Sequence, residues 1–279
     1  MNFADRASWT PSVVVLTCAI SSTVVFGDYT SEPFNRVLQR FVDPDGRVDY
    51  VAIARDRSDL DVFIATIAET SPDIRPNEFP AEESQLAYWI NAYNATVINL
   101  VVEHYPISSV KDVPSKGAGK LLSKLAGFFF EQKFELGGRT INLYGLEKNI
   151  IRKRFSDPRF HFALNCASLG CPRLPMRAFS ADDLEAELER ETRLFMNEDR
   201  NVRIDNESRT VWLSSIFKWY KKEFISYLKA NDPKEHASLI RYAELYCIGE
   251  KANALAEARR TGYHFDFIPY DWGLNGLGK

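Results

Sequence analysis

The chain has 279 residues, of which 45% are hydrophobic and 26% charged, and its formal net charge is −3. This composition excludes a disordered chain, because the hydrophobic residues are numerous enough to form a sizeable core. The balanced charge indicates neither a basic patch for nucleic acid nor an acidic tail for a basic partner. We therefore expect a globular protein without a nucleic-acid partner.

The N-terminal segment differs in character from the rest of the chain. Its apolar stretch, residues 13–26, has the length of a signal-peptide hydrophobic region and is too short to span a bilayer comfortably. Val25 and Gly27 are small enough to precede a signal-peptidase site. We predict a signal peptide over residues 1–27 and a protein that is periplasmic or secreted. An uncleaved N-terminal anchor and a lipoprotein signal ending at Cys18 are the alternatives, and no later segment is apolar enough to be a transmembrane span.

After the signal segment, the first half of the chain is predicted to be mainly helical. Apolar residues at helical spacing predict the helices, and Gly137-Gly138 between two alternating stretches predicts a hairpin. The predicted elements are helices over 32–41, 60–70 and 81–104, a flexible loop at 116–119, strands over 130–136 and 139–143, and a helix over 144–155.

The second half of the chain mixes strands with helices. The predicted elements are a strand over 159–165, a helix over 180–196 capped by Ser180, a hairpin of 201–205 with 210–213, helices over 216–229 and 233–259, and a strand over 263–268. Helices lie at both ends and strands in the middle, which indicates the α+β class. We predict a single globular domain over 28–279, with a central, mainly antiparallel sheet and helices packed around it.

Residues 160–172 concentrate the side chains that could carry chemistry. In a strand, alternate residues share a face, so His161 and Asn165 would lie together and Cys166 would point away. Cys166 can meet the imidazole only if the strand ends or bulges near Asn165. A Cys beside a His is the minimum for a thiolate nucleophile, because an imidazolium lowers the thiol pKa and the ring can move the proton.

Two other interpretations use the same side chains. Cys166 and Cys171 are close enough in sequence to form a structural disulfide, which an oxidising compartment would favour. Zinc could bind His161 and both cysteines, although their spacing matches no common zinc motif. The remaining cysteine, Cys247, lies in a predicted buried helix, where it would act as a small hydrophobic residue.

The helix predicted over 81–104 carries two asparagines in its middle. Asn91 and Asn94 share a face with Glu83 and Ala87. Asparagine is unfavourable inside a helix unless its amide forms hydrogen bonds. The two amides either tie down a loop or orient a catalytic histidine or a substrate.

Glu147 is a further candidate. It shares a helical face with Ile150 and Ile151, so we expect it to be partly buried. A buried carboxylate needs a partner, for which His161 and Arg152 are available. The alternative is an exposed glutamate that begins a helical salt bridge.

Several motifs occur together in one order along the chain. They are Gly46-Arg-Val-Asp-Tyr50, Trp89-Ile-Asn-Ala-Tyr-Asn94, Leu146-Glu147, the stretch from His161 to Pro172, Trp219-Tyr220 with Phe224, and Tyr270-Asp-Trp-Gly-Leu-Asn275. Together they resemble the domain-of-unknown-function family numbered 547, over residues 33–275. The resemblance implies one domain and singles out Glu147, His161, Cys166 and Cys171 as motif positions. It assigns no reaction.

The first functional hypothesis is a thiol-dependent hydrolase or acyl transferase that acts on a small-molecule or peptide substrate without a cofactor. Its chemistry would be loosely like that of the papain or transglutaminase class. Cys166 would be the nucleophile, His161 the base, and Glu147, Asn91 or Asn94 the group that orients the base. The alternatives are a non-enzymatic envelope binding protein with a structural disulfide, and a metal-dependent hydrolase.

Overall fold

The computed structural model describes residues 29–116 and 124–278. The predicted signal peptide, residues 1–27, lies outside these ranges, as does most of the loop predicted at 116–119. Helices surround two small sheets, which confirms the α+β class. The strands do not form one central sheet: a two-stranded antiparallel sheet and a three-stranded mixed sheet are separate.

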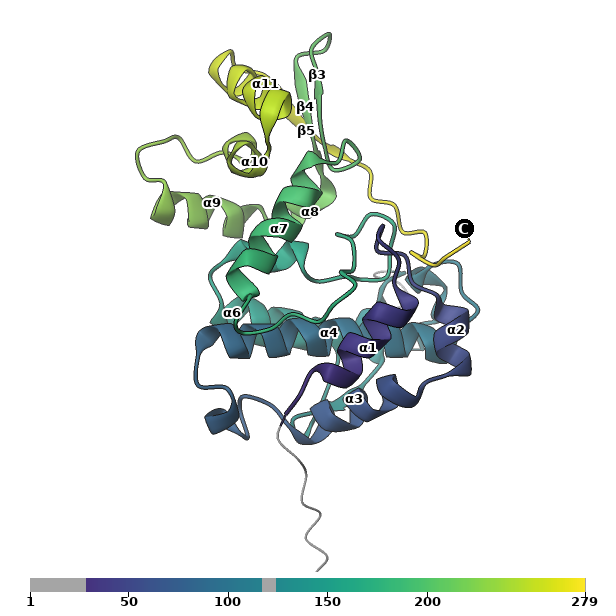
Figure 1. Ribbon diagram of the computed structural model, residues 1–279. Helices are drawn as coiled ribbons and strands as arrows, with labels where there is room; N and C mark the ends of the chain where they lie inside the picture. The colour runs from purple at the N-terminus through teal and green to yellow at the C-terminus, as the bar shows by residue number, and fades with distance from the viewer. Residues whose placement is uncertain (1–28, 117–123, 279) are drawn as a thin grey trace, which may run out of the picture.

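The first part of the chain folds into a group of helices in the lower half of Figure 1. They are α1 (Glu32–Phe41), α2 (Tyr50–Arg55), α3 (Ser58–Glu69) and α4 (Glu82–His104), with short 3₁₀ turns η1 (Pro76–Glu78) and η2 (Val110–Asp112). The Asp49 side chain caps α2 by accepting a hydrogen bond from the Ala52 N–H at 2.9 Å. The bounds of α1, α3 and α4 confirm the helices predicted over 32–41, 60–70 and 81–104.

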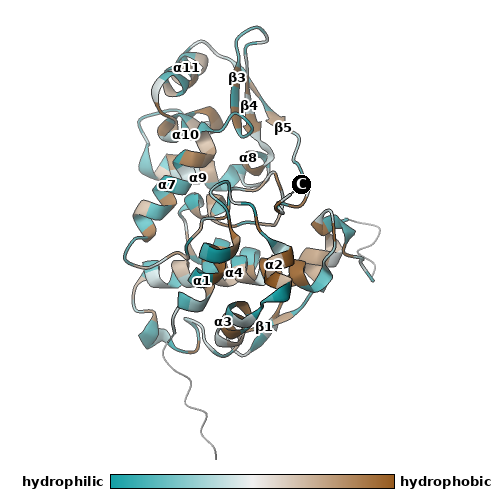
Figure 2. Cartoon of the chain, turned by 45° about the vertical axis from the view of Figure 1, so that its right-hand side comes forward, coloured by the Kyte–Doolittle hydropathy of each residue, from teal (hydrophilic) through white to brown (hydrophobic). Residues whose placement is uncertain are grey.

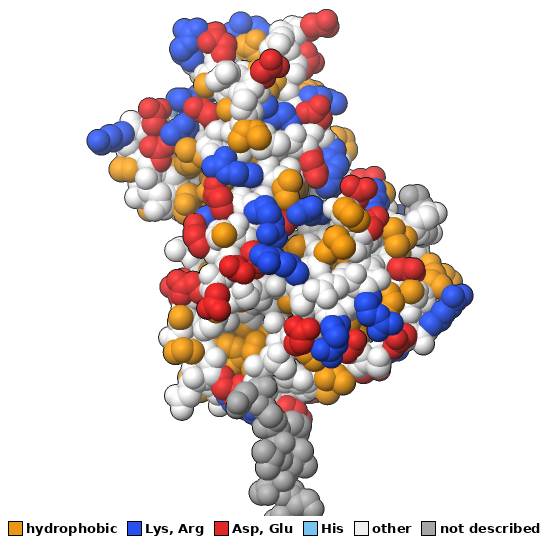
Figure 3. Space-filling view, viewed as in Figure 1, with side chains coloured by type: hydrophobic (Ala, Val, Ile, Leu, Met, Phe, Trp, Pro, Cys, Tyr) orange, Lys and Arg blue, Asp and Glu red, His pale blue; other side chains and the backbone are white. Residues whose placement is uncertain are grey.

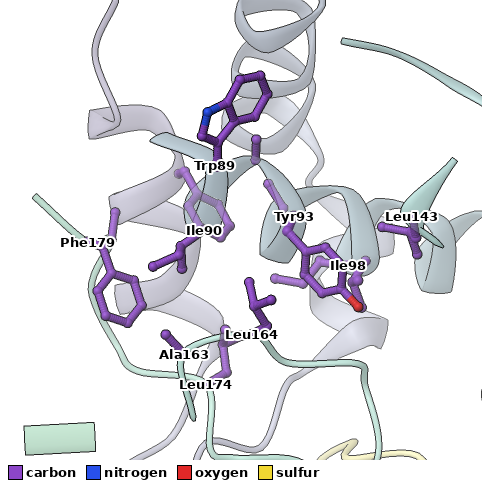
Figure 4. Close-up of a cluster of buried hydrophobic side chains, with 14 of the residues drawn as sticks. Trp89, Ile90, Tyr93, Ile98, Leu143, Ala163, Leu164, Leu174 and Phe179 are labelled. Carbon is purple, nitrogen blue, oxygen red and sulfur yellow. The ribbon is translucent and has the colours of Figure 1, made fainter. Parts of the chain in front are cut away.

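Helix α4 is the centre of the larger hydrophobic core. All its residues from Leu86 to Val102 are buried, which is expected of a helix that is apolar on every side. Figure 4 shows Trp89, Ile90 and Tyr93 projecting from α4 in different directions, with Leu164 and Phe179 from later segments nearby. We call the buried residues around α1 to α4 the first cluster.

The middle of the chain contains a short hairpin and an irregular helix. Strands β1 (Phe134–Leu136) and β2 (Arg139–Ile141) pair antiparallel across Gly137 and Gly138, whose φ values of 55° and 69° require glycine. This confirms the predicted hairpin, with shorter strands. The helical elements beside it are η4 (Gly127–Glu131), α5 (Leu143–Gly145), η5 (Leu146–Ile151) and α6 (Arg152–Arg154), of which the last three cover the helix predicted over 144–155.

The last part of the chain forms the upper half of Figure 1. Its elements are α7 (Leu184–Asn197), β3 (Val202–Asp205), β4 (Thr210–Ser214), α8 (Ser215–Trp219), α9 (Lys221–Asn231), α10 (Leu239–Tyr246), α11 (Gly249–Arg260) and β5 (His264–Ile268). Strands β3 and β4 form the predicted hairpin, and β5 joins β4 in parallel. The rings of Phe162, Phe217, Phe224 and Tyr242 pack together here, and we call the buried residues around them the second cluster.

The strand predicted over 159–165 is wrong. Residues Pro158–Phe162 form a 3₁₀ helix, η6, whose first turn is capped by the Asp157 side chain, which accepts from the Arg159 N–H at 2.9 Å. Proline at the first helical position favours this start. The alternating phenylalanines that suggested a strand serve two cores instead, because Phe160 lies in the first cluster and Phe162 in the second.

Three helix boundaries also differ from the predictions. The helix over 180–196 begins four residues later, at Leu184, and its first turn follows Asp183. The stretch 216–229 is divided at Tyr220. The stretch 233–259 is irregular up to Ser238, which caps α10, and then breaks before Gly249, where φ is 58°.

After β5 the chain returns to the first cluster, as the yellow trace in Figure 1 shows. Gly273 and Asp271 carbonyls accept hydrogen bonds from the Leu169 and Gly170 N–H groups, at 2.7 and 2.8 Å. The Tyr50 hydroxyl donates to Asn275 Oδ1 at 2.7 Å. This returning segment therefore links both parts of the chain.

Hydrophobic and hydrophilic positions alternate around the surface helices, as Figure 2 shows. On the face visible in Figure 3, basic and acidic side chains are interspersed. Across residues 29–116 and 124–278, no helix has both the length and the apolar character needed to cross a membrane.

Candidate functional site

A cavity of about 360 Å³ lies between the two clusters. Its walls are mainly aromatic, formed by Tyr93, Phe129, Phe130, Tyr144, Trp219, Tyr220, Tyr270 and Trp272. Three predicted site residues, Glu147, His161 and Cys166, also line it, together with Cys171. A concave, mostly apolar pocket with a few convergent polar groups is the usual form of a ligand site.

The imidazole of His161 is fixed in the cavity wall by η6. The residue is 4% exposed, and its ring stacks on Tyr220 with 3.7 Å between ring centroids. Its Nε2 lies 2.7 Å from Glu223 Oε2. Burial lowers the pKa of His161 below its usual value, and the Glu223 carboxylate offsets this only in part. The ring is therefore neutral at pH 7.

Glu223, at the start of α9, is a site residue that the sequence did not reveal. Its carboxylate accepts from Arg152 Nε at 2.9 Å as well as meeting His161. Burial alone would raise the pKa of Glu223, but the hydrogen bonds with His161 and Arg152 lower it overall. A chain of Arg152, Glu223 and His161 results. The only available signal was the position of Glu223 between Tyr220 and Phe224 in one of the motifs.

Glu147 is linked to the histidine through Tyr220. The Tyr220 hydroxyl donates to Glu147 Oε1 at 2.7 Å, and the Tyr220 ring stacks on His161. Arg152 Nη1 lies 3.8 Å from the same oxygen. The expected partial burial of Glu147 is confirmed, since its side chain is 17% exposed. Of its two expected partners, Arg152 is present, and the direct carboxylate contact to His161 is made by Glu223.

Both cysteines line the same cavity. Cys166 Sγ and Cys171 Sγ lie at disulfide-bonding distance. The Tyr270 hydroxyl is 2.9 Å from the first sulfur and 3.0 Å from the second, and the Cys166 N–H donates to Cys171 Sγ at 2.8 Å. Between them the chain turns at Ala167, which has a φ of 60°. Cys247 is a buried thiol remote from this pair, as expected of a small hydrophobic residue, although it follows α10 rather than lying inside it.

The two asparagines of α4 anchor backbone and do not line the cavity. Asn91 exchanges two hydrogen bonds with the backbone of Phe179, at 2.8 and 2.9 Å. Asn94 donates to the Ala163 carbonyl at 2.9 Å and accepts from the Asn165 N–H at the same distance. Asn94 therefore fixes the backbone that joins η6 to Cys166, whereas Asn91 fixes a segment farther along the chain.

Cys166 and His161 face the same cavity without a direct hydrogen bond in the part of the chain that the structure describes. His161 Nδ1 likewise has no hydrogen-bond partner among the described residues, which leaves this nitrogen available to a thiol or a ligand. In the same ranges, no three His, Cys, Asp or Glu side chains come together in a way that could hold a metal ion.

Comparisons with known proteins give one match. The model of the family described as "Protein of unknown function, DUF547" matches residues 76–196, a segment that contains α4, Glu147, His161 and both cavity cysteines. No curated protein and no solved structure matches the chain. The match supports the resemblance indicated by the motifs, and residues 76–196 are similar to the DUF547 family.

Proposed function

We propose that the protein is a thiol-dependent hydrolase or acyl transferase, with reduced Cys166 as the nucleophile and His161 as the base. The observation that carries this proposal is the 2.7 Å contact between Glu223 and His161 Nε2, beside a cavity that both His161 and Cys166 line. A carboxylate that orients a histidine, with the other ring nitrogen free for a nucleophile, is the arrangement that catalytic triads use.

The burial of His161 supports its role as a base. Because its pKa is lowered, the ring is neutral near pH 7 and can accept the Cys166 proton at Nδ1. The thiolate then attacks the substrate carbonyl, the imidazolium protonates the leaving group, and a thioester remains on Cys166. Water or a second nucleophile, deprotonated by the neutral ring, attacks this thioester and releases the thiolate. Glu223 stabilises the imidazolium during both steps.

The aromatic walls favour an apolar or aromatic acyl group. Trp219, Tyr270 and Trp272 contact one another with 4.5 to 5.9 Å between ring centroids, close to the two sulfurs. Aromatic rings of this kind contribute large apolar contact areas. We expect small esters and thioesters with phenyl-containing acyl groups to react faster than acetyl compounds.

Iodoacetamide labelling after mild reduction tests the nucleophile. Cys166 should react faster than an unperturbed thiol, and His161→Ala should slow the reaction about tenfold or more. His104→Ala is the matched control, because His104 lies at the end of α4, where its Nδ1 is 2.8 Å from the Leu100 carbonyl, and it does not line the cavity. A reduced Cys166 that reacts like a free thiol in both variants would contradict the proposal. Hydrolysis of phenylacetyl and acetyl thioesters by the same variants tests the reaction itself.

A non-enzymatic binding protein is the second candidate. It is favoured by the bonding distance between Cys166 and Cys171, because a permanent disulfide would make the sulfur unreactive. In that case reduction lowers the melting temperature, and Cys166→Ala leaves the binding of an aromatic ligand unchanged. Under the hydrolase proposal, the same variant abolishes turnover.

We also propose that the protein is exported, on the basis of the apolar stretch at residues 13–26. Mass spectrometry of the protein from its native host should find a mature N-terminus at Asp28. A chain that retains residues 1–27 and sediments with membranes would point to the anchor instead.

A further inference from the structure

We infer that Cys166 and Cys171 form a redox-active pair that exchanges with external thiols, with Cys166 as the attacked sulfur and Cys171 as the leaving sulfur. The observations are the bonding distance between the two sulfurs, their unequal exposure, and the hydrogen-bond donors that surround Cys171. This activity shares a sulfur with the proposed hydrolase but does not depend on acyl transfer.

The two sulfurs differ in their access to solvent. Both cysteines line the cavity, but Cys166 is partly exposed whereas Cys171 is 2% exposed. An external thiolate that enters the cavity therefore reaches Cys166 first. Thiol–disulfide exchange depends on which sulfur is accessible and on how well the leaving sulfur carries negative charge.

The donors around Cys171 favour it as the leaving sulfur. The Cys166 N–H points to Cys171 Sγ at 2.8 Å, and the Tyr270 hydroxyl lies 3.0 Å from it. Burial raises the pKa of Tyr270, so this hydroxyl keeps its proton. Hydrogen bonds to a charged acceptor stabilise it more than bonds to a neutral one. Cys166 Sγ lies 2.9 Å from the Tyr270 hydroxyl, but in the described part of the chain neither the Ser168 hydroxyl, to which it donates at 3.7 Å, nor any backbone N–H donates to it.

An external dithiol reduces the protein disulfide in two steps. The thiolate of an external dithiol attacks Cys166 Sγ, the Cys166–Cys171 bond breaks, and its electron pair remains on Cys171 as a thiolate. The second thiol of the dithiol, once deprotonated, attacks the sulfur bonded to Cys166 and releases the Cys166 thiolate. The protein disulfide is reduced, the dithiol is oxidised to a cyclic or intramolecular disulfide, and the two protons pass to the cysteine thiolates.

The exchange also controls the proposed hydrolase, because Cys166 can act as a nucleophile only after reduction. The partner we infer is a dithiol, either a small molecule or a protein with two neighbouring cysteines. The cavity volume of about 360 Å³ admits a small dithiol directly.

Single-cysteine variants treated with glutathione disulfide test the assignment of the two sulfurs. Cys171→Ser should form a mixed disulfide through Cys166 in the folded protein, at least tenfold faster than Cys166→Ser forms one through Cys171. Cys247→Ser is the control and should leave the reaction of the wild-type pair unchanged, because Cys247 is buried and its Sγ donates to the Met196 carbonyl. Equal rates in the two single-cysteine variants would overturn the assignment.

Reduction of the wild-type pair by dithiothreitol tests reversibility. In the reduced, native protein we expect iodoacetamide to label Cys166 and Cys171 together and to leave Cys247 unlabelled. If the reduced protein is reoxidised before iodoacetamide is added, neither Cys166 nor Cys171 should be labelled. Tyr270→Phe should slow reduction about tenfold, because the leaving thiolate loses a donor. Reduction that occurs only when Cys247 also becomes labelled would mean that the pair opens by unfolding, and it would overturn the inference.

Turnover assays separate the two proposals. If Cys171→Ser hydrolyses thioesters without a reductant while the wild type requires one, both proposals hold. If Cys166 forms the mixed disulfide faster than Cys171 but no reduced form of the protein hydrolyses thioesters, the hydrolase proposal fails and the proposal of thiol–disulfide exchange stands.

Discussion

The two hydrophobic clusters stabilise the cavity by different kinds of contact. The first cluster contains buried amides: Asn91 and Asn94 in α4 each make two hydrogen bonds to the backbone of a later segment. The second cluster relies on ring packing, with Phe224 and Tyr242 4.7 Å apart between ring centroids. Hydrogen bonds are directional and fix a backbone in one place, whereas apolar contacts tolerate small shifts.

The cavity combines both kinds of support. The backbone that leads to Cys166 is fixed by the first cluster, through Asn94. The acid that orients His161 comes from α9 in the second cluster, next to Phe224. His161 itself lies between Phe160 and Phe162, which belong to different clusters. The comparison predicts that damage to each cluster has a different signature at the site.

The largest effect is expected from Phe224→Ala. The ring is fully buried and contacts Phe162, Phe217 and Tyr242. Its removal should lower the free energy of unfolding by about 3–5 kcal/mol, measured by urea denaturation. The exposed neighbour Ser226→Ala is the control and should change it by less than about 0.5 kcal/mol. A loss below about 1 kcal/mol would mean that the second cluster repacks to fill the space left by the ring. The two clusters would then differ less in how they stabilise the cavity.

The next largest effect is expected from Asn94→Ala. It leaves the Ala163 carbonyl and the Asn165 N–H buried without partners, so we expect a loss of about 2–4 kcal/mol. Labelling of reduced Cys166 should change as well, because the backbone leading to it is no longer fixed. Asn91→Ala is the matched variant: it should lose similar stability but leave Cys166 labelling unchanged, since its bonds go to Phe179. Identical labelling in both variants would argue against a specific role for Asn94.

A smaller effect is expected from pH. The pKa of His161 is lowered in the folded protein, so between that value and about 6.5 the unfolded chain binds more protons. Stability should therefore be complete above about pH 6.5 and fall as the pH decreases, by at most about 1.4 kcal/mol per pH unit from this group. The lowered pKa of Glu223 adds a further loss below about pH 4.5. Urea denaturation of wild type and His161→Gln at several pH values measures the contribution of His161 to stability. If the free energy of unfolding changes equally with pH in both proteins between pH 6.5 and 5, the pKa of His161 is not lowered by folding.

The smallest effect is expected from Tyr220→Phe. The variant keeps the ring that stacks on His161 and removes the hydroxyl that donates to Glu147. We expect a loss of about 1 kcal/mol in unfolding free energy. The pH dependence of stability due to His161 should persist, because Glu223 still contacts Nε2. A loss of that pH dependence would show that Glu147, through Tyr220, controls the histidine.

The sequence predicted the regular elements better than the site. Helices α1, α3 and α4 and both hairpins were predictable, because apolar periodicity and Gly137-Gly138 are local signals. The prediction failed at 159–165, because the phenylalanine pattern reflects two different cores rather than the two faces of a sheet. The capping residues Asp157 and Pro158 were the better guide there.

The candidate site was predictable only in part. Glu147, His161 and Cys166 all line one cavity, whereas the other two candidates, Asn91 and Asn94, bind backbone instead. The carboxylate in direct contact with the histidine, Glu223, lies 62 residues away in sequence, and no local pattern links the two. Pairing across such a distance is decided by how the two clusters pack, which periodicity does not encode.

The returning segment after β5 has a consequence for synthesis of the protein on the ribosome. Asn275 contacts Asn165 across 110 residues, and its N–H donates to the Ala167 carbonyl beside Cys166. At about 5–20 residues per second, translation of the intervening chain takes on the order of 5–20 seconds. During that interval the two cysteines lack the neighbouring Tyr270 hydroxyl and the strand-like contacts of the tail. Both cysteines are thus synthesised well before the tail that completes their surroundings.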